Sequence, residues 1–340
     1  MKKVLVTGGA GYIGAHTAVE LIEAGYEVVI VDDFSKSDRT LLEGIEAVTS
    51  RKVNFFQGDC GDEAFLKGVF EWAGPFAAVM HFAAYKSVGE SVEKPLDYYR
   101  NNLGSLISLL KTMKVFGVTN LIFSSSCTVY GQPDTIPVDE ATPFKRAESP
   151  YGATKQMCER ILEDAYSRGY RVISLRYFNP IGAHPSALLG ELPVGTPNNL
   201  VPFITQTAAG IREKLTVFGD DYDTPDGTCV RDFIHVVDLA QGHLKALEYL
   251  SAVPAGDLCE VFNLGTGEGV SVLQLINKFV ETTHVKVPYS IGPRRSGDVE
   301  KTYGNVSKAN RILQWKARFS VEESLFHAWN WEKKIRDIKN

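Results

Sequence analysis

The chain has 340 residues, 44% of them hydrophobic, and its 36 Lys and Arg against 41 Asp and Glu give a net charge of −5. This length can bury a large core and indicates two lobes. The absence of a long block of one charge argues against a nucleic-acid partner, and no apolar stretch is long enough to span a bilayer.

The cysteines indicate the compartment. They are odd in number and scattered, and none forms a C-x-x-C pair: Cys60, Cys127, Cys158, Cys229 and Cys259. This pattern predicts neither a disulfide framework nor structural zinc, and we expect no metal site. The apolar run behind the basic start, residues 1–3, is too short for a signal peptide, so we expect a reducing cytoplasm.

A glycine-rich turn follows the first predicted strand, Val4–Val6. Gly8, Gly11 and Gly14 are spaced as G-x-x-G-x-x-G and open an apolar-periodic run through Leu21. Glycines allow close approach of a phosphate, and the helix that starts here offers free N–H groups and its positive dipole end. A nucleoside-triphosphate loop is disfavoured because no Lys-Ser/Thr pair follows. We predict a dinucleotide site.

Asp32 closes a second predicted strand, Glu27–Val31, at the distance where a carboxylate meets an adenosine ribose. A carboxylate there repels an extra phosphate, so we predict NAD rather than NADP, although Lys36 and Arg39 lie close in sequence. The alternative is a tight strand-to-helix turn with no ligand.

Strand and helix patterns then alternate. Strands are predicted at Val53–Phe56, Ala77–Phe82, Leu121–Ser125 and Val172–Leu175, with helices such as Leu96–Phe116 and Tyr151–Arg168 between them. This order predicts an α/β fold with a doubly wound parallel sheet of the Rossmann type over residues 1–179.

The composition and the strand–helix pattern change after Asn179. Residues 180–232 are rich in proline and glycine, with few strand signals and one helix starting near Leu200. Further on, the patterns predict helices over 235–250 and 271–280 and a strand over 261–264. We predict a smaller mixed α/β lobe over 180–340, with segments near 233–265 returning to the first sheet.

Tyr151 and Lys155 form Y-x-x-x-K at the start of a predicted helix, just after Pro150. A spacing of four places both side chains on one helix face. Free tyrosine has a pKa of about 10, too high for a base at neutral pH. A nearby ammonium and a cationic nicotinamide would lower that pKa, so the pair predicts an acid–base centre.

Three serines and a threonine lie at the carboxyl end of a predicted strand, where open parallel sheets bind ligands. The run is Phe-Ser-Ser-Ser-Cys-Thr-Val-Tyr-Gly over residues 123–131. A hydroxyl here can bond a substrate oxygen and pass a proton to Tyr151. We predict this role for Ser126, with Thr128 as the alternative. For Ser124 and Ser125, a polar turn with local hydrogen bonds is a competing interpretation.

The glycine turn, the Ser/Tyr/Lys set and the strand order resemble the extended short-chain dehydrogenase/reductase superfamily, and further segments resemble its UDP-galactose 4-epimerases. These segments are Gly89–Pro95, Asn101–Asn102, Arg176–Pro185, Pro197–Leu200, Gly227–His235 and Pro293–Asp298. The resemblance implies interconversion of UDP-glucose and UDP-galactose through a 4-keto sugar, with extension to N-acetylated sugars. Tyr151 would take the C4 proton with help from Ser126, NAD would carry the hydride, and Lys155 would hold the nicotinamide ribose.

The same resemblance implies the ligand contacts. Those expected for NAD are Gly8, Gly11, Tyr12, Ile13, Gly14, Asp32, Asp33, Asp59, Cys60, Phe82, Ala83, Ala84, Lys86, Asn101, Tyr151, Lys155 and Phe178. Those expected for the nucleotide sugar are Lys86, Ser126, Asn179, Asn199, Leu200, Phe218, Arg231, Arg295, Asp298 and Thr302. Arginine forks suit the diphosphate, and helix-start amides suit phosphate or uracil. Asp59 could equally make a strand-end turn, and Lys86 could be solvated.

Thr302 occupies the position that, in the family, limits room beside sugar C2. In the family, tyrosine there accompanies restriction to glucose and galactose, so a small threonine predicts activity on UDP-N-acetylglucosamine. An alternative is that the acetylated sugar nucleotide is the main substrate. Tyr303 follows directly, and a shift of one residue would reverse the inference.

Two other functions compete. Dehydratases of the superfamily place an Asp-Glu pair after the strand serine or threonine, whereas this chain has Cys127 and Thr128; a decarboxylase is disfavoured with them. A non-catalytic NAD-sensing protein would not need Tyr151 and Lys155. The resemblance also implies a homodimer in which helices near 96–116 and 151–168 form a four-helix bundle, although their apolar faces could instead cover the sheet.

Overall fold

The computed structural model describes residues 1–295 and 297–338. Ser296 of the Pro293–Asp298 segment and residues 339–340 at the end of the predicted second lobe lie outside the described residues. Within the described ranges, no helix has both the length and the apolar character needed to cross a membrane.

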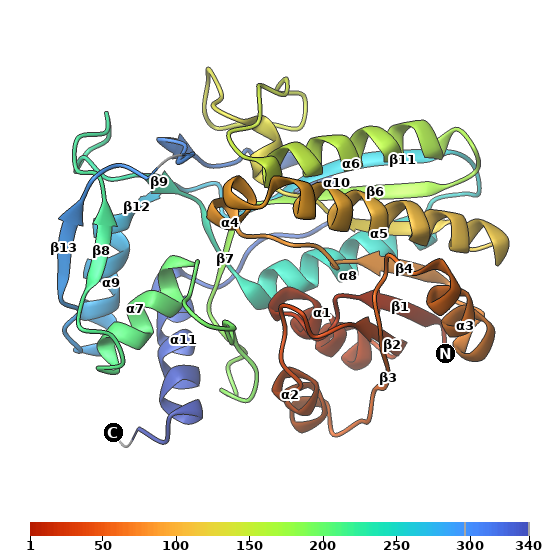
Figure 1. The fold of residues 1–340 in the computed structure, drawn as a ribbon, viewed down its shortest axis with the longest axis horizontal. Helices are drawn as coiled ribbons and strands as arrows, with labels where there is room; N and C mark the ends of the chain where they lie inside the picture. Colours follow the sequence, from red (N-terminus) through yellow and green to blue (C-terminus); the bar gives the residue numbers. More distant parts are fainter. Residues whose placement is uncertain (296, 339–340) are drawn as a thin grey trace.

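A seven-stranded parallel sheet lies at the centre of the molecule (Figure 1). Its order is β11–β6–β5–β4–β1–β2–β3. The strands are β1 (Lys3–Thr7), β2 (Glu27–Asp32), β3 (Asn54–Gln57), β4 (Ala78–His81), β5 (Asn120–Ser124), β6 (Arg171–Tyr177) and β11 (Leu258–Leu264). Most are runs of buried apolar residues, as in sheets covered on both faces. The predicted doubly wound sheet is confirmed.

Helices cover both faces of this sheet. They are α1 (Tyr12–Glu23), α2 (Thr40–Thr49), α3 (Glu63–Ala73), α4 (Val88–Glu93), α5 (Pro95–Val115), α6 (Pro150–Tyr166) and α8 (Val236–Ala252). Side chains alternate along a strand, so Val4 and Val6 pack with α1, α2 and α8, whereas Leu5 packs with α3, α5 and α6. The strand order reverses between β1 and β4, which places a ligand crevice at their carboxyl ends.

Shorter strands make up the rest of the molecule, at the left in Figure 1. The pairs are β7 (Asn179–Ile181) with β10 (Phe233–His235), β8 (Leu215–Phe218) with β13 (Tyr289–Gly292), and β9 (Val230–Arg231) with β12 (Val270–Ser271) and β14 (Lys301–Thr302). The helices here are α7 (Leu200–Ala208), α9 (Val272–Thr283) and α11 (Val321–Ile335), whereas α10 (Ser307–Ile312) packs against β11 of the large sheet. Most of these strands span two to four residues, too short for a period of two to reveal in the sequence. The lobe boundary at residue 179 stays a prediction.

Asp232 ties three of these segments together. Its buried carboxylate accepts hydrogen bonds from Thr266, from the Gly267 amide and from the Gly304 amide. Its own amide donates to the Thr302 carbonyl at 3.2 Å. A buried carboxylate is stable only with such donors, so Asp232 holds β14 beside β9.

Candidate functional site

The glycine turn is shaped by direct backbone contacts. Gly8 has φ 70°, and a Cβ there would lie 2.6 Å from the Ala83 nitrogen. A Cβ on Gly14 would lie 2.3 Å from the Gly8 carbonyl oxygen. Gly11 is the N-cap of α1, and no side chain caps this helix. The first-turn N–H groups are therefore available to an anion such as a pyrophosphate.

Asp32 joins the end of β2 to this turn. Its Oδ2 accepts from the Ala10 amide at 3.0 Å, and its Oδ1 accepts from Phe34 and Ser37. Burial raises its pKa, and the hydrogen bonds from Ser37, Phe34 and Ala10 oppose that rise. Because Oδ2 accepts one hydrogen bond from the protein and has two lone pairs, it can also accept a ribose hydroxyl.

The other residues expected near NAD lie around the ends of the same strands. The Phe82 amide bonds the Thr7 carbonyl at 2.9 Å, which brings residues 82–84 beside the glycine turn. Cys60 is buried, and burial raises its pKa. Asp33 and Asp59 each accept a bond from the amide two residues on, so both make local turns.

Asn102 makes a set of hydrogen bonds for which the sequence analysis predicted no role. Its side chain accepts from the Tyr85 amide and donates to the Tyr85 carbonyl and to Thr154 of α6. It also accepts from the predicted site residue Asn101 at 3.0 Å. Its burial and these four bonds link the loop after β4 to the helix that carries Tyr151.

The structure brings Ser126, Tyr151 and Lys155 together at the carboxyl end of β5. Ser149 caps α6, so the helix presents Tyr151 in its first turn and Lys155 one turn later. The Lys155 ammonium donates to the Ser124 carbonyl at 2.6 Å and lies 5.9 Å from the Tyr151 ring centre. All three side chains are less than 9% exposed.

Thr128 orients Ser126. The Ser126 Oγ accepts from the Thr128 amide at 3.2 Å and from the Thr128 hydroxyl at 3.0 Å. A serine oxygen has two lone pairs and one proton, so these bonds leave the Ser126 proton free to act on Tyr151, whose pKa Ser126 lowers. Thr128, the alternative in the sequence analysis, is here a donor to Ser126.

The electrostatics of Tyr151 differ from the expectation. Burial raises the pKa of Tyr151, as does Tyr177, and only the hydrogen bond with Ser126 lowers it. Burial also lowers the pKa of Lys155 to about 8, while Cys158 and Glu159 raise it. The expected lowering of the Tyr151 pKa by Lys155 is therefore outweighed by desolvation.

The predicted diphosphate ligands converge on Asp298. Arg295 pairs with its Oδ1 at 2.6 Å and Arg231 at 3.8 Å. The ring of Phe218, at the end of β8, lies 5.7 Å from the Arg295 guanidinium. Asp298 thus holds two cations side by side, which suits it to position them rather than to contact a phosphate itself.

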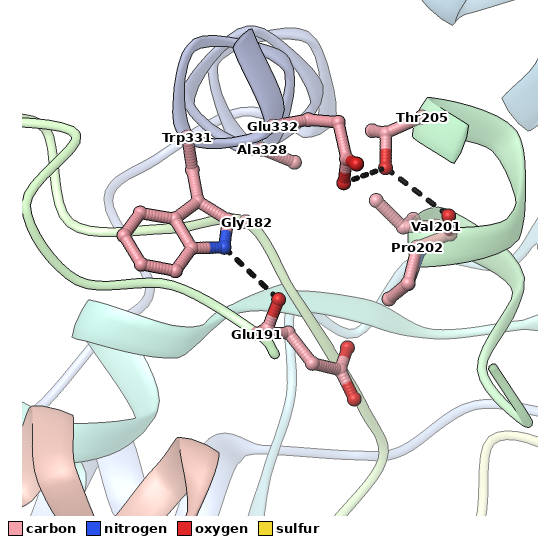
Figure 2. A pocket seen from close by; sticks show the side chains of 8 residues that line it. All are labelled: Gly182, Glu191, Val201, Pro202, Thr205, Ala328, Trp331 and Glu332. Atoms are coloured by element: carbon pink, nitrogen blue, oxygen red, sulfur yellow. Dashed lines mark hydrogen bonds between the residues drawn. The ribbon is translucent and has the colours of Figure 1, made fainter. Parts of the chain in front are cut away.

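Glu191 joins two further predicted residues. Its carboxylate accepts from Asn199 at 2.5 Å and pairs with Lys86 at 3.4 Å. Figure 2 shows the small cavity behind it, where Trp331 donates to the Glu191 carbonyl at 3.0 Å. The lining is Gly182, Glu191, Val201, Pro202, Thr205, Ala328, Trp331 and Glu332. A lone glutamate in an irregular segment carries no pattern, so sequence reasoning missed it.

Asn199 and Leu200 lie at the predicted helix start. Asn199 is the N-cap of α7, and its side chain does not bond the helix amides. Phe178 packs with Val129 and Tyr130 beside the serine turn. The Asn179 amide bonds the Asp232 carbonyl at 2.9 Å. Phe178 and Asn179 thus join β6 directly to the shorter strands.

Thr302 and Tyr303 point to opposite faces of their small sheet. Thr302 of β14 is paired with Arg231 of β9 in parallel register, and paired residues share a face. Thr302, 7% exposed, therefore lies on the face of Arg231. Tyr303 lies on the other face, beside Gly269 and Val230.

The described residues contain no group of three or more His, Cys, Asp or Glu side chains arranged to hold a metal ion.

Comparison with known proteins gives full-length matches. A family model described as GDP-mannose 4,6 dehydratase matches residues 5–327. UDP-glucose 4-epimerase from Dictyostelium discoideum is 48% identical over 97% of this chain and 95% of that protein. Bifunctional protein GAL10 from Pachysolen tannophilus is also 48% identical, over 98% of this chain but 49% of that protein. The crystal structure of UDP-glucose 4-epimerase from Bifidobacterium longum in complex with NAD+ and UDP has a TM-score of 0.95 at 45% identity, covering 99% of each chain.

Gly14→Ala is expected to lower the amount of NAD carried by the purified protein at least about tenfold, a change of about 1.4 kcal/mol in binding. The added methyl would lie 2.3 Å from the Gly8 carbonyl oxygen and distort the turn. Gly68→Ala in α3, where a Cβ meets nothing within 4 Å, is the matched control. Chromatography of nucleotide released by denaturation measures the content per chain; equal content in the two variants would contradict the assignment.

Proposed function

Since this chain belongs to the UDP-glucose 4-epimerase family of the extended short-chain dehydrogenases/reductases, we propose that Ser126, Tyr151 and Lys155 carry its chemistry. The chain is an isomerase that interconverts UDP-glucose and UDP-galactose and uses NAD. The observation that supports the residue roles best is that all three side chains are buried together, with the Lys155 ammonium 5.9 Å from the Tyr151 ring centre on one helix face.

The residues fit NAD at the carboxyl ends of β1, β2 and β4. The uncapped start of α1 would hold the pyrophosphate, and Asp32 would accept from the adenosine ribose. A Cβ at Gly8 or Gly14 would fill this cradle. When bound, NAD supplies the hydride acceptor and donor for sugar C4, together with a positive charge that favours phenolate.

The protein's own residues handle the proton. Tyr151 would exchange the proton directly with the oxygen on C4, and the single Ser126 proton would be available to bond either the phenolate or that oxygen. Lys155, fixed by the Ser124 carbonyl, stabilises the phenolate that forms. Arg231 and Arg295 would hold the diphosphate while the 4-keto sugar turns its other face, because their contacts do not involve the sugar ring.

A dehydratase reaction is not favoured, although the matching family model bears that description. Elimination of water needs an additional acid and base near C5 and C6. The positions after Ser126 are Cys127 and Thr128, and burial raises the pKa of the Cys127 thiol to about 12. Neither residue can serve as that carboxylate pair.

Tyr151→Phe should reduce turnover of UDP-galactose by about 10²- to 10⁴-fold, the usual contribution of acid–base catalysis, while NAD stays bound. The assay adds no NAD and resolves UDP-glucose from UDP-galactose by chromatography. Tyr166→Phe, near the end of the same helix, is expected to keep parental activity. Parental activity of Tyr151→Phe would remove Tyr151 from the mechanism.

UDP-N-acetylglucosamine is a second proposed substrate. Support comes from the position of Thr302, which shares the face of Arg231, the side of the small sheet on which the diphosphate is proposed to bind. Tyr303 lies on the opposite face, so its bulk does not reduce the space beside the sugar. A small side chain leaves room for an acetamido group.

Thr302→Tyr is expected to reduce turnover of UDP-N-acetylglucosamine by about 100-fold because the larger ring would occupy the acetamido space, with most UDP-galactose turnover kept. Parallel assays of the two substrates supply the internal control. No turnover of the acetylated sugar by the parent protein would refute the proposal.

A cytoplasmic homodimer is the proposed state in the cell. Its support is the apolar surface of the α5–α6 pair, where Leu96, Ile107 and Met157 are 78%, 42% and 44% exposed, although other residues of both helices cover the sheet. The described cysteines are all free, as in reducing compartments.

Cell fractionation should find the protein in the cytoplasmic fraction, and light scattering should then give twice its 37.5 kDa chain mass. A single-chain mass at micromolar concentration would contradict the dimer.

A further inference from the structure

One face of α6 carries a third polar residue below the Tyr151–Lys155 pair. Glu159 follows Lys155 by four residues, so Tyr151, Lys155 and Glu159 occupy successive turns of the same face. Glu159 is only 3% exposed, whereas the Glu163 side chain on the next turn is 55% exposed. A buried carboxylate is costly unless it is paired, so its partners define what it does.

Two groups hold the Glu159 carboxylate. Arg176 of β6 donates to it from Nε at 3.0 Å and from Nη2 at 2.6 Å. The fully buried Ser125 hydroxyl donates to Oε1 at 2.5 Å. Ser125 is the central residue of the serine turn: the Ser124 carbonyl accepts from Lys155, and Ser126 lies close enough to Tyr151 to lower its pKa. Glu159 therefore fixes the middle of the segment that touches both catalytic residues.

The charge of Glu159 also acts on Lys155, where burial lowers the pKa to about 8 while Cys158 and Glu159 raise it. Apart from the Arg176 guanidinium, which is always charged, the other titratable groups facing this pair are neutral near pH 7. Burial lowers the pKa of His81 on β4 to about 3 and raises that of Cys259 on β11 to about 11. Tyr177 of β6 and Tyr98 of α5 face Tyr151, and burial raises both of their pKa values.

We propose that Glu159 is a positioning residue for the epimerase: it holds the Ser124–Ser126 turn through Ser125 and keeps Lys155 an ammonium beside Tyr151. The inference rests on the proposed roles of Ser126, Tyr151 and Lys155. The competing explanation is that Glu159 and Arg176 only fasten α6 to β6.

The pH dependence of kcat separates these explanations. In Glu159→Gln the ammonium of Lys155 loses the stabilising charge of a buried carboxylate one helical turn away. The pKa that sets the alkaline limb of the kcat–pH profile should therefore fall by at least about one unit. Glu163→Gln makes the same change one turn further along, at an exposed position, and should leave the limb unmoved. If folded Glu159→Gln keeps the alkaline limb of its kcat–pH profile at the parental pH, the charge role is overturned. A purely structural residue would lower kcat equally at all pH values.

Thermal unfolding gives a reading that does not depend on activity. Below its folded pKa of about 8, Lys155 is protonated in the parent and is stabilised by Glu159. In Glu159→Gln the folded pKa is lower, so the variant gains stability with rising pH before the parent does. The gap between the two melting temperatures should therefore narrow as the pH rises to about 8. If the difference in melting temperature is the same at every pH, Glu159 stabilises the fold only through its pair with Arg176.

Ser125→Ala tests the other route and leaves the ion pair intact. We expect kcat to fall about tenfold, the equivalent of a lost hydrogen bond to a charged group, with KM little changed and the alkaline limb at the parental pH. A parental kcat in Ser125→Ala overturns the positioning role of the turn.

If Glu159→Gln does not fold, Glu159→Asp serves in its place because it keeps the charge. Its alkaline limb should stay at the parental pH while kcat falls, and a limb at lower pH would contradict the proposal. Failure of the parent to convert UDP-galactose would refute the proposed function, and the melting comparison would still decide the Glu159–Lys155 coupling.

Discussion

The site depends on how three consecutive buried serines satisfy their hydroxyl groups at the end of β5. Ser124 shares a hydrogen bond with Tyr177 at 2.5 Å, Ser125 donates to Glu159, and Ser126 accepts twice from Thr128. Buried hydroxyl groups must be paired, so each partner limits the position of the turn. The result is a carbonyl that faces Lys155 and a hydroxyl that faces Tyr151.

Two carboxylates hold the residues that are proposed to bind the substrate. Asp232 holds β14 beside β9, which places Thr302 next to Arg231. Asp298 in turn holds Arg231 and Arg295 together. The residues proposed for the chemistry thus lie at the large parallel sheet, while those proposed for substrate recognition lie on short strands held by buried or partly buried carboxylates. Substrate choice can change at such positions without disturbing the acid–base centre.

Local patterns were enough to predict the parallel sheet, the glycine turn and the spacing of Tyr151 and Lys155, because each is encoded within a few residues. Glu159, Glu191 and Asn102 could not be assigned this way, since each has a partner far away in the chain: Ser125 at 34 residues, Lys86 at 105 and Thr154 at 52, respectively. The strands β9 and β14 have two residues each and exist through long-range pairing. The direction of the Tyr151 pKa was also beyond the sequence, because it depends on burial, which only the folded chain reveals.

The central claim is that one held NAD and one Tyr151 complete an oxidation and its reversal at the same carbon. Conversion of UDP-galactose labelled with deuterium at C4, in the presence of excess unlabelled NAD, tests this most directly. The account predicts that UDP-glucose keeps the deuterium at C4, because the hydride never leaves the site. Loss of the label to solvent or to the added NAD would contradict it.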